Sequence, residues 1–64
     1  MKLDELLEGL NLIESNQPDA EIAFDSNAIY VGDSHGPMDE FDNNELVELG
    51  WNVNEDCWVL LLQS

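Results

Sequence analysis

The chain has 64 residues, 44% of them hydrophobic, with fifteen Asp and Glu residues against a single Lys, and its formal net charge is −14. This length forms one domain, residues 1–64, near the size at which folding buries only about 60% of the unfolded surface. One cation cannot neutralise phosphates or anionic headgroups, so the composition excludes direct binding to nucleic acid and to acidic membranes.

The first element that the sequence predicts is an amphipathic helix. Apolar residues recur at helical spacing from Leu3 to Ile13, with carboxylates between them, which favours three helical turns. Asp4 and Glu5 suit the positive end of the helix dipole. Pro18 disfavours helical geometry in the residue before it, so we expect the helix to end within residues 15–19.

Two short β-prone runs follow and predict a hairpin. Residues 21–25 alternate polar and apolar side chains, and residues 28–32 are centred on Ile29, Tyr30 and Val31. Ser26-Asn27 is expected to be the two-residue turn between them. The Gly and Pro content of residues 33–38 then indicates a loop.

A second helix is predicted near residues 43–49, with an extra turn from Asp39 as an alternative. Asp42 followed three residues later by Glu45 is a capping-box pattern, which indicates a helix start. Gly50 supplies the left-handed residue with which helices often end.

The C-terminal residues predict one or two further strands. Residues 51–54 alternate, Glu55-Asp56 suits a turn, and residues 57–63 form an apolar run typical of a central strand. The resulting order is αββαβ or αββαββ. We therefore expect an α+β fold, in which two helices pack on one face of an antiparallel sheet of three or four strands.

Few residues suit catalysis, and we expect neither an enzyme nor a cofactor. Asp33, Ser34 and His35 are adjacent in a loop, whereas a nucleophilic triad draws its members from separate elements. Cys57 has no basic neighbour to stabilise a thiolate, so we expect it to fill the core. Trp51 and Trp58 are also expected in the core, because a small domain needs their apolar area.

The N-terminus and the single cysteine indicate the cytoplasm. Cys57 has no partner for an intramolecular disulfide, which suits a reducing compartment. Residues 1–5 are acidic where a signal or transit peptide would be basic. The longest apolar run, residues 58–62, is too short to span a bilayer, so we expect no membrane partner.

The acidity exceeds what solubility requires, which is a net charge of magnitude about 2 to 8 in a small domain. A chain of this length has a radius of gyration of roughly 11 Å, which corresponds to a sphere about 28 Å across, and a B-DNA duplex about 28 Å long carries about sixteen phosphates. This excess favours a binding role over solubility or adaptation to high salt. The carboxylates expected to contact a partner lie on or near the two helices: Asp4, Glu5, Glu8, Asp39, Glu40, Asp42, Glu45 and Glu48.

The segment from Leu46 to Trp58, preceded by Ala-Ile-Tyr-Val-Gly at residues 28–32, resembles very small phage and prophage proteins that end in an L-G-W, acidic-turn, C-W pattern. With its acidity and size, the chain is similar to the anti-CRISPR proteins that act on type I, most specifically type I-C, Cascade complexes. The resemblance implies a phage protein in the bacterial host cell that binds a basic DNA-binding surface, such as that of the Cascade large subunit. It would block target DNA by charge mimicry.

Two alternatives remain open on the sequence. One is a phage accessory module without a DNA-mimic role, which dimerises through an exposed Trp58 strand, so that the chain is a monomer or a weak dimer. The other is an acidic cation-binding protein, whose oxygen ligands are crowded into one region without the spacing of an EF-hand: Asp33, Asp39, Glu40, Asp42 and Glu45.

Overall fold

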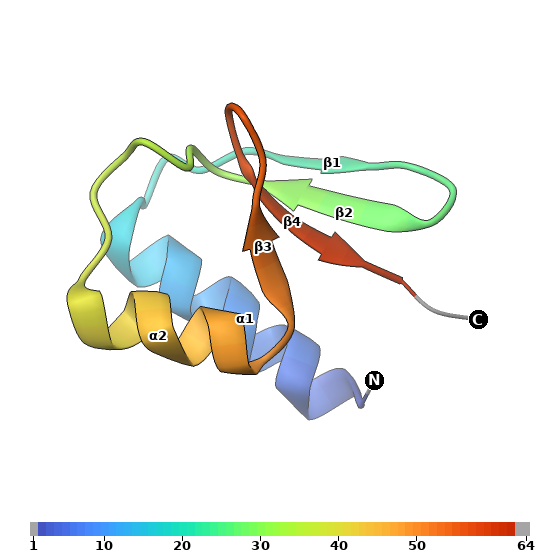
Figure 1. The fold of residues 1–64 in the computed structure, drawn as a ribbon, viewed down its shortest axis with the longest axis horizontal. Coiled ribbons are helices and arrows are strands. Elements are labelled where there is room, and N and C mark those ends of the chain that lie inside the picture. The colour runs from blue at the N-terminus through green and yellow to red at the C-terminus, as the bar shows by residue number, and fades with distance from the viewer. Residues whose placement is uncertain (1, 63–64) are drawn as a thin grey trace.

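The computed structural model describes residues 2–62 and shows two helices and one four-stranded antiparallel sheet (Figure 1). The elements in chain order are α1 (Leu3–Asn16), β1 (Ile22–Phe24), β2 (Ala28–Val31), α2 (Glu40–Glu48), β3 (Trp51–Val53) and β4 (Trp58–Leu61). The predicted α+β fold is confirmed, with the longer of the two expected orders, αββαββ. No helix within these residues is long and apolar enough to cross a membrane.

The sheet has the strand order β1-β2-β4-β3, because the two hairpins join through β2 and β4. In β4, Trp58 pairs with Val31 on one side and with Val53 on the other. The apolar C-terminal run is therefore a central strand, as its composition predicts; its last predicted residue, Gln63, lies outside the described residues. Dimerisation through an exposed Trp58 strand was the wrong expectation, because both edges of β4 are already paired.

The hydrophobic core lies between the helices and one face of the sheet. The register places Ile29, Leu60 and Trp51 in one cross-strand row, so that their side chains point to the same face. Trp51 is 1% exposed and Trp58 is 2% exposed, which confirms their core role. The buried cluster consists of Ile13, Ile29, Val31, Leu46, Trp51, Trp58 and Leu60.

Both helices pack on this face of the sheet and run antiparallel to each other (Figure 1). The Nδ2 group of Asn16, at the end of α1, donates to Oδ2 of Asp42 over 2.8 Å. Its Oδ1 atom accepts from the backbone N–H of Asp39, also over 2.8 Å. One amide thus ties the C-terminal end of α1 to the first turn of α2.

Helix α2 begins one turn earlier than the Asp42 pattern indicates. Asp39 is the N-cap, and its Oδ2 atom accepts from the backbone N–H groups of Phe41 (3.0 Å) and Asp42 (3.4 Å). The capping box at Asp42 was the wrong assignment, because that carboxylate bonds to Asn16 instead. The helix ends as expected at Gly50, whose φ of +99° places it in the left-handed region.

Candidate partner-binding surface

Carboxylates from both helices lie on the side of the helical layer that faces away from the sheet. Helix α1 buries Gly9 and Ile13, and helical geometry places Asp4 and Glu8 on its opposite side. Helix α2 buries Leu46, and the same argument places Glu40 and Glu48 on its outward side. Both helices cover one sheet face (Figure 1), so the exposed residues Asp4, Glu8, Glu40 and Glu48 all belong to one helical layer, and we call this set of carboxylates the acidic helical face.

The other four predicted site residues have positions that make them less available for contact with a partner. Asp39 caps α2, and Asp42 faces Asn16 in the seam between the helices. Glu5 accepts from the backbone N–H of Lys2 over 3.3 Å at the start of α1. Glu45 is only partly exposed. The structure therefore divides the eight predicted residues into four that face outward and four that lie at the margins or support the helices.

The supporting role of Asp39 gives a stability prediction. We expect Asp39→Ala to lower the free energy of unfolding by about 1 kcal/mol, because two N–H groups at the start of α2 lose their acceptor. Urea denaturation followed by tryptophan fluorescence measures the change. Asn44→Ala, at an exposed position of the same helix, serves as the control and should cause no loss. Equal stability of the two variants would contradict the assignment of Asp39 as the cap.

The adjacent residues Asp33, Ser34 and His35 hold a loop and do not form a triad. The hydroxyl of Ser34 donates to the backbone carbonyl of Asn54 over 3.0 Å. Nε2 of His35 lies 2.8 Å from the carbonyl oxygen of Glu55. Oδ1 of Asp33 accepts from the backbone N–H of His35. The contacts of Ser34 and His35 attach the loop to the turn between β3 and β4, and the bond from Asp33 lies within the loop, in agreement with the loop assignment from the sequence.

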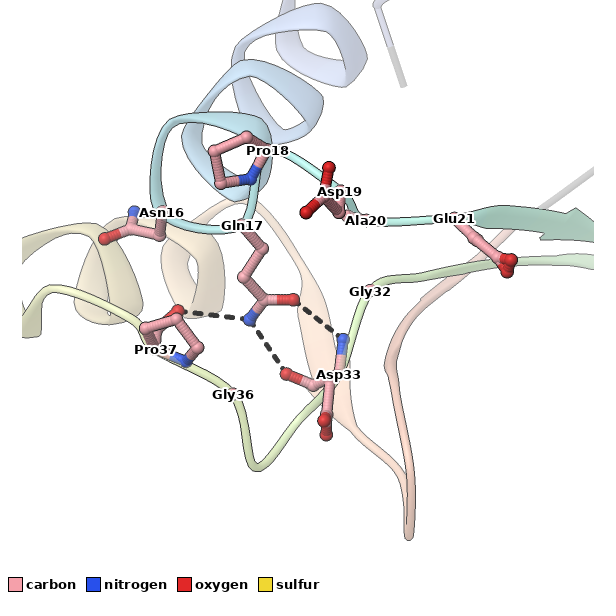
Figure 2. A pocket seen from close by; sticks show the side chains of 10 residues that line it. All are labelled: Asn16, Gln17, Pro18, Asp19, Ala20, Glu21, Gly32, Asp33, Gly36 and Pro37. Carbon is pink, nitrogen blue, oxygen red and sulfur yellow. Dashed lines mark hydrogen bonds between the residues drawn. The ribbon is translucent and has the colours of Figure 1, made fainter.

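Gln17 is a buried polar residue that the sequence did not single out. Its side chain is 8% exposed, and its Nε2 group donates to the carbonyls of Asp33 (2.9 Å) and Pro37 (3.1 Å). Its Oε1 atom accepts from the backbone N–H of Asp33 over 2.8 Å (Figure 2). One amide thus attaches the loop before α2 to the end of α1. The only local signal was its position before Pro18, which indicates a helix end and not a buried side chain.

An open pocket surrounds this amide (Figure 2). Its walls come from residues 16–21 and from the loop that contains Gly32, Asp33, Gly36 and Pro37. The donors of the Gln17 amide already bond to backbone carbonyls of the chain. The buried amide is therefore committed to the loop and has no donor left for a ligand.

The carboxylates expected to crowd around a cation do not converge. Among residues 2–62, no three His, Cys, Asp or Glu side chains come together in a group that could hold a metal ion. Asp39 and Asp42 instead contact the backbone of α2 and the side chain of Asn16. The cation-binding alternative therefore loses the cluster on which it depended.

The acidic helical face is the strongest candidate site in this structure. It presents carboxylates from two adjacent helices, and Lys2 is the one Lys or Arg in the whole chain. Such a surface attracts cations and basic proteins and repels nucleic acid. No protein-family model, no curated protein and no solved structure matches the chain, so the interpretation depends on its own residues and geometry.

Proposed function

We propose that this protein is an inhibitor that binds a basic DNA-binding surface of a host defence protein and blocks target DNA by charge mimicry. The target that the sequence resemblance favours is a type I Cascade complex, with its large subunit as the contact. The observation that carries the proposal is the acidic helical face, formed by Asp4, Glu8, Glu40 and Glu48. Carboxylate oxygens accept hydrogen bonds from Arg and Lys side chains in the same way as phosphate oxygens do.

The dimensions of the molecule are compatible with such a role. Its longest axis is 30 Å, and B-DNA of that length carries about eighteen phosphates, at one charge per 1.7 Å of axis. The chain carries fifteen carboxylates in a similar length. The radius of gyration of 10.6 Å is close to the size expected from the sequence. The charge per unit length thus approaches that of the DNA which the protein would displace.

Inhibition by this route needs no chemistry and no reading of bases. Cas-type complexes hold nucleic acid in positively charged channels, largely through contacts to the backbone. The inhibitor and the DNA would compete for the same Arg and Lys side chains, so bound inhibitor excludes DNA. Electrostatic attraction would speed the encounter in the cytoplasm of the host cell, and the rate would fall as salt is raised.

Charge reversal on α2 tests the proposal. We expect the Glu40→Lys/Glu48→Lys double variant to compete with DNA for purified Cascade at least about 10-fold less well, a loss of about 1.4 kcal/mol. Two exposed ion pairs are lost, and each is replaced by repulsion between like charges. Gel-shift competition at about 50 and 200 mM salt measures the loss together with its salt dependence.

The control is Asp19→Lys/Asp56→Lys, which changes the net charge equally at exposed positions outside the helices. This pair should retain most of the competition, and circular dichroism should show that both variants fold. Equal weakening by both pairs would assign the effect to net charge and not to the acidic helical face. Full competition by both pairs, or no competition by the unmodified protein, would leave charge mimicry of Cascade-bound DNA without support.

A further inference from the structure

The sheet face opposite the helices carries a row of side chains centred on Tyr30. Within residues 2–62 both helices pack on the other face, so no helix lies over this one (Figure 1). Ile29 belongs to the core, and alternation along β2 therefore turns Tyr30 to the open face. Ala23 of β1 and Val59 of β4 pair with Tyr30 and point the same way.

A second row on this face runs through Glu21, Gly32 and Cys57. The backbone N–H of Gly32 donates to the carbonyl oxygen of Glu21 over 2.9 Å, which extends the pairing of β1 with β2 by one position. Cys57 comes directly before Trp58, the partner of Val31, and so stands opposite Gly32. The core role expected for Cys57 was wrong, because its side chain is half-buried and lies outside the core cluster.

The small residues of these two rows leave a hollow in the open face. Gly32 has no side chain and Ala23 has only a methyl group, so a space remains between Glu21 and Tyr30. A Cβ atom at Gly32 would lie 2.6 Å from Oε1 of Gln17, so a larger residue does not fit there. The volume of the hollow is about 660 Å³, within the range of about 300–1,000 Å³ that ligand sites occupy. Its walls are residues 20–23, Tyr30, Gly32 and Cys57, and we call it the Tyr30 hollow.

The Tyr30 hollow combines a carboxylate with an aromatic ring. Glu21 is exposed and Tyr30 is half-buried. They are diagonal neighbours across β1 and β2, and such positions are about 7–8 Å apart. A guanidinium group placed between them donates hydrogen bonds to the carboxylate and stacks on the ring. Lys2, the one Lys or Arg of the chain, precedes α1 on the other side of the sheet (Figure 1), so the cation has to come from another molecule.

We infer that the Tyr30 hollow binds an arginine side chain of the basic partner protein. Arg suits it better than Lys, because its guanidinium is planar, more weakly hydrated than an ammonium group and able to stack on a ring. A second copy of this chain is the wrong occupant, because the sequence contains no Arg. The inference rests on the proposed function in one respect, namely that the partner is a basic protein.

This position of the Tyr30 hollow also restricts the shape of the partner. The acidic helical face belongs to the helical layer, whereas Glu21 and Tyr30 point away from that layer on the other side of the sheet (Figure 1). One flat surface cannot contact both sides of the sheet. A partner that engages both must surround the protein with cationic side chains, as a positively charged nucleic-acid channel does.

An NMR titration of the ¹⁵N-labelled full chain tests the inference. The probe is N-acetyl-arginine amide, and its matched control is N-acetyl-citrulline amide, in which a neutral urea group replaces the guanidinium. At millimolar concentrations, we expect the arginine probe to shift the backbone signals of Glu21, Tyr30 and Gly32, and the citrulline compound to leave them unchanged. Glu21→Gln and Tyr30→Leu should each weaken binding about 2- to 5-fold. Tyr30→Phe keeps the ring and should bind as the unmodified chain does.

The control variant is Glu14→Gln, which makes the same change of charge at an exposed position of α1. It should bind the arginine probe as the unmodified chain does. Equal weakening by Glu14→Gln and Glu21→Gln, or equal binding of N-acetyl-lysine amide, would overturn the inference. Self-association in sedimentation experiments that Tyr30→Leu abolishes would also overturn it, since the open face would then bind a second copy.

The same variants separate this inference from the proposed function. If the arginine probe does not bind and Glu21→Gln/Tyr30→Leu competes with DNA for Cascade as well as the unmodified chain does, the inference is wrong and charge mimicry is unaffected. If the arginine probe binds in the Tyr30 hollow but the unmodified chain does not compete with DNA, the inference is supported and the proposed target is wrong.

Discussion

Replacing Gln17 by Ala will lower the free energy of unfolding by about 2–4 kcal/mol, the largest effect that we expect from a single substitution outside the apolar core. The change removes three hydrogen bonds of 2.8–3.1 Å, which join the end of α1 to Asp33 and Pro37. Each bond contributes about 0.5–1.5 kcal/mol, and a backbone group left unpaired in a buried site costs more. Native domains are stable by only about 5–15 kcal/mol, so the change should remove a large fraction of the stability of a chain this small.

Urea denaturation measures this loss through Trp51 and Trp58, because both indoles leave the core on unfolding. Gln17→Met is the matched variant, since it keeps the length of the side chain and removes its hydrogen bonds. It should lose nearly as much stability as Gln17→Ala. Gln17→Glu should also be destabilised, because a carboxylate oxygen would replace the amide donor that faces two carbonyl oxygens. If Gln17→Met and Gln17→Glu have the same urea midpoints as the unmodified protein, the amide does not hold the loop.

Gly9→Ala will destabilise the protein by about 1–3 kcal/mol, although Ala normally favours a helix over Gly by about 1 kcal/mol. A Cβ atom at Gly9 would overlap Nε1 of Trp51 and lie 3.0 Å from its Cε2 atom. Trp51 is 1% exposed, so its ring cannot move without repacking the core. The buried Nε1 group also finds no hydrogen-bond partner among the described residues.

Thermal unfolding tests this prediction, since 1 kcal/mol corresponds to about 4–8 °C in a domain of this size. Asn11→Ala, at an exposed position of the same helix, is the control and should raise Tm slightly. In a double-mutant cycle, Gly9→Ala should cost less when Trp51 is replaced by Phe, because the overlapping nitrogen is then absent. A rise in Tm for Gly9→Ala would contradict the close packing of α1 on β3.

Features that depend on neighbours in the chain were predictable from the sequence. Apolar spacing between Leu3 and Ile13 predicted α1, alternation predicted the hairpin, and Gly50 marked the end of α2. Each is a local property, because helix and strand periodicity arise from the geometry of adjacent residues. The apolar composition of β4 likewise predicted its central place in the sheet.

Features that depend on residues far apart in the sequence were not predictable in this way. Asp39 and Asp42 are equally good caps by residue type. Asp42 is instead hydrogen-bonded to Asn16, which lies 26 residues before it in the sequence. Gln17 looks like an ordinary polar residue at a helix end, and only the return of the loop toward α1 buries its side chain. In both cases, tertiary contacts decided between local options of similar energy.

For the candidate site, the sequence alone was enough to predict a strongly acidic chain with eight carboxylates on or near two helices. It did not determine which of them share a surface. That depends on the packing of α1 and α2 on one side of the sheet, which leaves Asp4, Glu8, Glu40 and Glu48 exposed in one helical layer and gives Asp39 and Asp42 structural contacts. The physical reason is that charge follows from composition, whereas its direction in space follows from the burial of Ile13, Leu46 and Trp51 in a common core.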